Sequence, residues 1–144
     1  MPQQSLVLLV EHKGARNQGH TKALVDAGFR VESVASEEAN IARVLARRPA
    51  VVAAELDGHG ALAALDLARR FRENPRARLI PFIIYGHHLR ARDIEDAARA
   101  GALWLQLEPA DGARLVAAVR GVIAASLREN VAADEPRGRS ENRA

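Results

Sequence analysis

Glutamate and histidine side chains follow four of the short apolar segments in this sequence. These residues are Glu11 and His12, Glu55, His87 and His88, and Glu108. Carboxylates and imidazoles can transfer protons, and together they can also bind a divalent cation. Three glutamates brought close together repel one another, so their cluster requires a cation, a protonated carboxyl group or an arginine. The chemistry open to these residues therefore depends on whether the fold brings them to one place.

The elements that would position these residues alternate between strands and helices. Five short, mostly apolar segments have the length of buried strands and cover residues 6–10, 29–34, 50–54, 79–84 and 102–107. Between them apolar residues recur at helical spacing, most clearly at Leu115, Val116, Val119, Val122 and Ile123. This alternation predicts a flavodoxin-like α/β fold, a doubly wound parallel sheet of order 2-1-3-4-5 with helices on both faces. The more polar segment 29–34 suits a strand at the sheet edge. The carboxyl ends of parallel strands meet at one edge, so the glutamates and histidines should converge there.

Length and composition limit the class of protein. The 144 residues fit one domain, which we place at residues 1–129, with a polar, disordered tail at 130–144. No cysteine is present, so disulfides and thiolate metal sites are excluded and a cytoplasmic location is expected. No apolar run is long enough to span a membrane, and no signal peptide is visible. The net charge of +3 comes from arginines placed among acids, and aromatic residues are few, so nucleic-acid binding is not expected.

Several spaced landmarks resemble those of a known family. Arg48 and Pro49 precede the segment that ends at Glu55, and Ile80 and Pro81 open the next one. Further on come Ala-Gly-Ala at residues 100–102 and Glu-Pro at 108–109. Over about residues 5–126 the pattern resembles the receiver domain of bacterial two-component response regulators, the CheY-like fold. The resemblance implies a signalling domain with this fold.

The resemblance also implies which positions would carry phosphorylation. In receivers an Asp accepts the phosphoryl group, an acidic pair holds Mg²⁺, and a Thr or Ser and a Lys stabilise the product. In the same order, the residues here are Glu55, the pair Glu11 and His12, Gly86, and Glu108. The switch aromatic of the fifth strand corresponds to Leu105, with Trp104 one position earlier. Glu11 keeps the family's charge, Glu55 is a carboxylate one methylene longer than Asp, and Glu108 would repel an incoming phosphoryl group by several kcal/mol.

These departures predict a degenerate pseudo-receiver. We expect a single-domain signalling protein that acts by binding a protein partner, without phosphorylation at Glu55 and without enzymatic activity. Glu55 either mimics phospho-aspartate and fixes one state, or pairs with Lys13 or a nearby histidine. The expected contact surface is the fourth helix, the fifth strand and the fifth helix, with Trp104 and Leu105 as its contacts, and a homodimer could form there. Trp104 is either an exposed anchor or buried under a helix.

Two alternatives remain, and both use the same strand-end residues. A receiver-like domain could bind Mg²⁺ or a transition metal through Glu11, His12 and Glu55, with His59, His87 or Glu108 as further ligands. An enzyme could use Glu11 and Glu55 as acid and base. The sequence has neither a tightly spaced metal-ligand motif nor a glycine-rich phosphate loop that would support these alternatives. We therefore expect no cofactor. In the first helix, Gly19 and Ala23 indicate either tight packing or a mobile helix.

Overall fold

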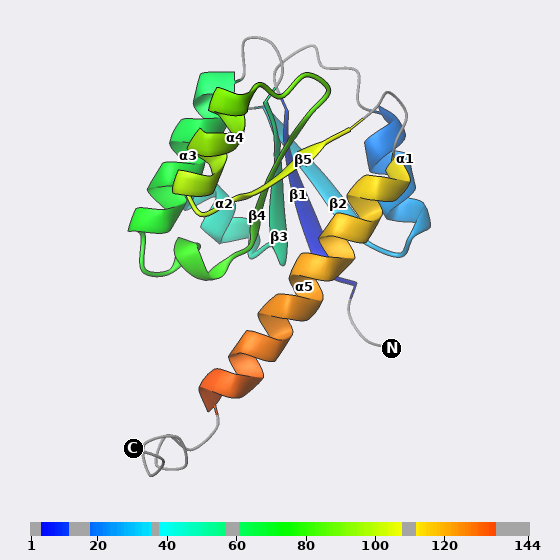
Figure 1. The fold of residues 1–144 in the computed structure, drawn as a ribbon. Coiled ribbons are helices and arrows are strands. Elements are labelled where there is room, and N and C mark those ends of the chain that lie inside the picture. The colour runs from blue at the N-terminus through cyan, green and yellow to red at the C-terminus, as the bar shows by residue number, and fades with distance from the viewer. Residues whose placement is uncertain (1–3, 12–17, 36–37, 57–60, 108–111, 135–144) are drawn as a thin grey trace.

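The computed structural model describes residues 4–11, 18–35, 38–56, 61–107 and 112–134. Strands and helices alternate along the chain (Figure 1). In order they are β1 (Leu6–Glu11), α1 (Gln18–Asp26), β2 (Arg30–Ala35), α2 (Ile41–Arg47), β3 (Val51–Glu55), α3 (Ala61–Glu73), the 3-10 helix η2 (Ala77–Leu79), β4 (Phe82–Gly86), α4 (Ala91–Arg99), β5 (Leu103–Gln106) and α5 (Gly112–Asp134).

The strands form one parallel sheet of order β2-β1-β3-β4-β5, which confirms the predicted topology. The central strands are almost wholly buried because helices cover both of their faces, and this explains their continuous apolar sequences. β2 is partly exposed along its whole length. Its more polar sequence therefore belongs to an edge strand, as predicted.

Two apolar cores lie on the two faces of the sheet (Figure 1). One core packs α2, α3 and α4 against the sheet, with Val44, Leu65 and Phe71 among its members. The other packs α1 and α5 through residues such as Leu24 and Leu115. Successive strand residues alternate between the two cores, so the parity of a strand residue decides which helices its side chain meets.

Small residues let α1 and α5 approach closely. A Cβ atom added to Gly112 of α5 would lie 2.6 Å from the Cβ of Ala23 and 3.4 Å from the carbonyl oxygen of Gly19. No side chain larger than hydrogen fits at Gly112 without a shift of the helices. Ala23 of the first helix therefore packs tightly against Gly112 of the last helix, as the first of the two interpretations expects, whereas a Cβ atom at Gly19 would meet nothing within 4 Å.

The last helix is longer than the sequence suggested. We placed residues 130–144 in a disordered tail, but α5 continues to Asp134. Residues 130–134 include Val131 and two alanines, which a helix accommodates, and the first strong helix breaker is Pro136. Residues 135–144 lie outside the described residues, and the rest of the domain boundary stays a prediction. No helix in the described ranges is long and apolar enough to cross a membrane.

Candidate functional site

Glu11 and Glu55 lie side by side at the carboxyl edge of the sheet. Each is the last residue of its strand, β1 or β3, and the preceding residues Val10 and Ala54 are paired in the parallel ladder. Because side chains alternate along a strand, both glutamates fall on the face of the sheet that α1 and α5 cover. Glu55 is 3% exposed, whereas Glu11 is half-buried. The predicted convergence of strand-end carboxylates is therefore present for these two residues.

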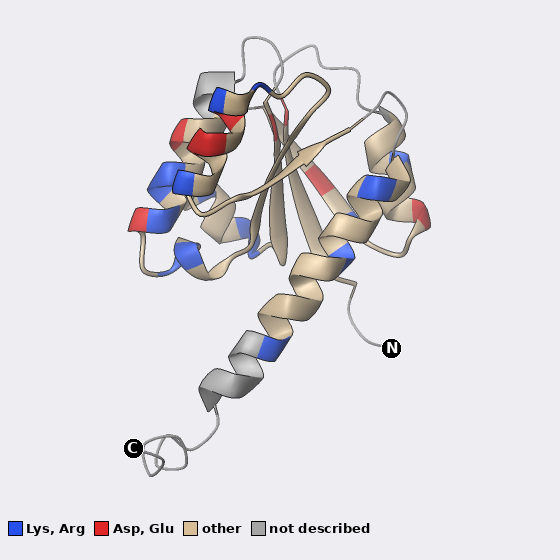
Figure 2. Cartoon of the chain, in the orientation of Figure 1, with Lys and Arg blue, Asp and Glu red and all other residues tan. Residues whose placement is uncertain are grey.

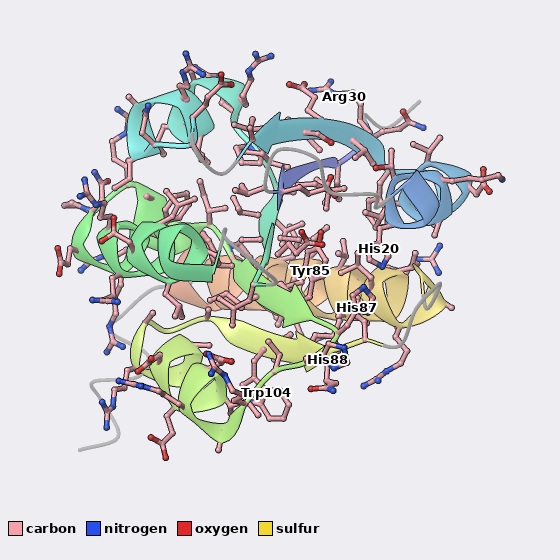
Figure 3. The ribbon with its side chains drawn as sticks, turned by 90° about the horizontal axis from the view of Figure 1, so that it is seen from above. His20, Arg30, Tyr85, His87, His88 and Trp104 are labelled. Carbon is pink, nitrogen blue, oxygen red and sulfur yellow. The ribbon has the colours of Figure 1, made fainter. Side chains whose placement is uncertain are left out.

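Three aromatic rings lie at the same edge, next to these carboxylates. His20 of α1 is buried and meets the ring of Tyr85 edge to face, with centroids 5.4 Å apart. The same histidine stacks on His87 at 6.1 Å (Figure 3). Tyr85 is paired with Glu55 in the ladder between β4 and β3. Rings contributed by α1, β4 and the residue after β4 therefore gather at this edge of the sheet.

His20 and Tyr85 were not among the site residues predicted from the sequence. The sequence signal for His20 was its place on the apolar side of a short helix. A polar imidazole buried there needs hydrogen-bonding or ring partners, which marks the residue as a candidate. The sequence does not show which strand residue the helix will meet. That contact is fixed by the packing of α1 on the sheet.

A hydrogen bond to the backbone determines the tautomer of neutral His87. Its Nδ1 lies 2.9 Å from the carbonyl oxygen of Leu107. A carbonyl oxygen only accepts, so Nδ1 carries the proton and donates, and Nε2 holds the lone pair in the neutral ring. This arrangement is typical of histidines that are oriented for a function or for packing. By contrast, His88 is exposed.

The described residues do not by themselves form a metal site. Among them, no group of three His, Asp or Glu side chains lies close enough to bind a metal ion. Glu11, Glu55 and His87 are therefore insufficient without a further ligand. The other candidates lie outside the described residues, namely His12, His59 and Glu108.

Gly86 occupies the carboxyl end of β4, where the resemblance placed a hydroxyl-bearing residue. It is the last residue of the strand and is buried. A glycine offers only its backbone, and the Gly86 carbonyl oxygen accepts a 2.9 Å hydrogen bond from the amide of Leu107. The end of β4 therefore has no side-chain donor at this position.

The side chain of Gln106 connects β5 to the segment after β4. Its Nε2 donates to the carbonyl oxygen of His87 at 3.0 Å, and its Oε1 accepts from the amide of Leu89 at 3.2 Å. One amide group thus holds both ends of residues 87–89. This contact orients the backbone that carries His87.

Trp104 lies on the outer part of β5, beside α4 (Figure 3). It is 42% exposed, and the adjacent Leu103 is 44% exposed. Trp104 is therefore not buried under a helix, and its role as an anchor stays a prediction. Leu105 is partly buried and packs against the core under α1 and α5.

Comparisons with known proteins identify the fold. Neither a scan of protein-family models nor a search of curated proteins gave a match. Solved structures do match, including the chemotaxis response regulator CheY4 of Vibrio cholerae, with a TM-score of 0.69 and 19% identity over 83% of this chain and 99% of that chain. A response regulator from Thermotoga maritima matches with a TM-score of 0.65 and 21% identity, covering 85% of this chain and 99% of that chain.

NtrX from Brucella abortus gives a TM-score of 0.78 at 18% identity. The match covers 94% of this chain but 30% of the NtrX chain. These likenesses show that the chain has the CheY-like receiver fold, as predicted from the sequence.

Proposed function

We propose that this chain is a receiver-like signalling protein of the cytoplasm that works by binding a protein partner, without phosphorylation at Glu55. It needs no cofactor and turns over no substrate. One observation carries the proposal: buried Gly86 ends β4 beside the strand that ends in Glu55, so the site lacks a hydroxyl group where the receiver pattern has one. The receiver fold supports a signalling role, although a fold alone does not determine function.

The charges near Glu55 support the same conclusion. Transfer of a phosphoryl group to a carboxylate requires positioning and neutralisation of negative charge. Glu55 is 3% exposed, and the resemblance places a glutamate, Glu108, where receivers carry the lysine that neutralises the phosphoryl charge. Each unit of negative charge about 4 Å away opposes a phosphoryl charge by roughly 4 kcal/mol at an effective dielectric constant of 20. Phosphorylation should therefore be disfavoured.

Intact-mass analysis after incubation with acetyl phosphate and Mg²⁺ tests this proposal. We expect the mass of the protein to stay unchanged. A positive control is the fourfold variant His12→Asp, Glu55→Asp, Gly86→Thr and Glu108→Lys, which restores the receiver pattern and should form a phospho-adduct. A stable adduct on the native chain that disappears in Glu55→Gln would overturn the proposal.

The partner surface that we propose is formed by α4, β5 and α5. Exposed Leu103 and Trp104 supply apolar area on β5, and tryptophan is a frequent anchor of protein interfaces. A homodimer through this surface is part of the proposal.

A divalent-metal site is the alternative, because Glu11 and Glu55 lie side by side and His87 lies at the same edge. Imidazole with carboxylates would suit Zn²⁺ or Mn²⁺ better than Mg²⁺. Calorimetric titration with each ion separates the two functions, because a saturable heat that is lost in Glu11→Gln would favour the metal site.

A further inference from the structure

A small pocket lies at the other end of the sheet from Glu55. It opens between the end of α3, η2, the start of β4 and the turn before β5, and its volume is about 200 Å³. Phe71 and Phe82 form an apolar wall, with their rings edge to face at 5.0 Å and both side chains buried. Ile80 lines the pocket beside them. The wall of the pocket on this side is thus apolar, and its side chains are well packed.

Two exposed arginines, Arg72 and Arg78, also line this pocket. Arg72 Nη1 donates a hydrogen bond to the carbonyl oxygen of Arg99, which holds the guanidinium next to Gly101. Gly101 has a φ of +77°, which glycine adopts readily, and a Cβ atom there would lie 3.7 Å from Arg72 Cδ, so the turn packs against the Arg72 side chain. The cation is therefore positioned at the pocket by the backbone.

The surrounding surface is strongly basic. Residues 69–79 contain Arg69, Arg70, Arg72, Arg76 and Arg78, with Glu73 as the single acid. Within the part of the chain that the structure describes, the ion pairs of this segment involve Arg70, which pairs with Asp66 at 2.9 Å. Arginines that look scattered in the sequence thus gather at the end of α3, along η2 and at the end of α4 (Figure 2).

The shape of the η2 segment is fixed, and it presents an apolar side chain beside these cations. Asn74 Oδ1 accepts hydrogen bonds from the amides of Arg76 and Ala77 at 2.9 and 3.0 Å, which sets the turn into η2. Leu79, which lies between two pocket residues in the sequence, is 72% exposed. An exposed leucine beside an apolar pocket enlarges the apolar area that a partner could cover.

The volume and the charge together indicate the occupant. Pockets for cofactors and drug-sized ligands usually have roughly 300–1,000 Å³, so about 200 Å³ suits a single apolar side chain better. Guanidinium groups pair with carboxylates in a two-pronged geometry. Phe71 and Phe82 are 2% and 7% exposed, so their rings are not available for stacking on nucleic-acid bases.

We propose that this pocket binds an acidic segment of a partner protein, which places one apolar side chain in the pocket against Ile80 and the small exposed parts of Phe71 and Phe82, while its carboxylates pair with Arg72 and Arg78. The inference rests on the proposed function, since it assumes that the chain acts through a protein partner. It gives that partner a chemical character and a second contact surface, which meets the surface of α4, β5 and α5 at the turn between α4 and β5.

An NMR titration of the full ¹⁵N-labelled chain with a short probe peptide tests this proposal. The probe is blocked Asp-Glu-Leu-Glu-Asp, and its two controls replace Leu by Ser or all acidic residues by Lys. We expect saturable shifts at the amides of Arg72, Ala100 and Gly101. The dissociation constant should rise at least tenfold for the Ser peptide, for Arg78→Glu and at high salt. Arg128→Glu, an equal charge change at an exposed residue of α5, should leave it unchanged.

Four results would overturn the pocket proposal. They are no shift at these amides, equal binding of the Ser peptide, equal binding by Arg78→Glu, and tighter binding of a DNA duplex to the same amides. Any of these would leave the absence of phosphorylation untouched, because that is tested separately by intact mass. A phospho-adduct in that experiment would refute the proposed function but not the peptide binding.

Discussion

At the scale of single residues, Gln106 is the side chain whose role can be tested most directly. Replacing it with Ala removes the acceptor for the Leu89 amide and the donor for the His87 carbonyl oxygen. We expect the free energy of unfolding to fall by about 1–2 kcal/mol, because the two backbone groups are partly buried. Amide exchange should quicken at Leu89.

The internal control for this variant is the amide of Leu107, which donates to the Gly86 carbonyl oxygen and does not involve the Gln106 side chain. Its exchange rate should stay close to the native rate. Equal acceleration at both amides would mean that the substitution loosens β5 as a whole, and would contradict a local role for Gln106.

The sequence predicted some residues of the site and missed others, for a physical reason. The position of Glu11 and Glu55 follows from the alternation of side chains along a strand and from the general strand order of doubly wound sheets. His20 meets Tyr85 and His87 only because α1 packs at one particular depth on the sheet. Such contacts depend on tertiary packing, which a single sequence does not reveal.

At the scale of elements, the close approach of α1 and α5 gives the sharpest prediction. In Gly112→Ala the new methyl carbon would lie 2.6 Å from the Cβ of Ala23, so the helices must move apart. We expect a loss of about 1–3 kcal/mol in the free energy of unfolding, as is usual for overpacking. Urea unfolding followed by circular dichroism measures it.

Gly121→Ala is the matched control on the same helix. A Cβ at Gly121 meets nothing within 4 Å, so only helix propensity changes, and a gain of about 0.5–1 kcal/mol is expected. If Gly112→Ala stabilised the protein as much as Gly121→Ala, the tight packing of α1 on α5 would be refuted.

The order of the elements was predictable because the apolar segments have clear lengths and spacing. The first and last residues of the elements were harder to predict. β4 was expected over residues 79–84 but runs from Phe82 to Gly86, because the preceding residues form η2, whose shape depends on Asn74. The extension of α5 to Asp134 was missed because polar composition suggested a tail, although no helix breaker precedes Pro136.

At the scale of the whole molecule, the two ends of the sheet differ in charge. The carboxyl edge carries Glu11 and Glu55, and the amino ends of β4 and β5 lie near Arg72 and Arg78. The sequence indicated a basic protein with its arginines dispersed among acids. The fold separates part of these charges, because α3, η2 and α4 turn their ends toward the same place (Figure 2). Linear spacing does not reveal this grouping.

The proposed homodimer through α4, β5 and α5 can be followed with the single tryptophan of the chain. β5 is the edge strand opposite β2, and Trp104 is 42% exposed on it, so acrylamide should quench its fluorescence efficiently at low protein concentration. If β5 lies in a dimer interface, quenching should weaken as concentration rises and as sedimentation velocity shows a dimer.

Trp104→Ala should weaken the dimer by about 2 kcal/mol or more, which is about thirtyfold in its dissociation constant. Val25→Ala, which removes an exposed side chain from α1, should leave the dimer unchanged. A chain that stays monomeric with constant quenching across the concentration range would rule out this interface, and the surface of α4, β5 and α5 would then be free for a different protein.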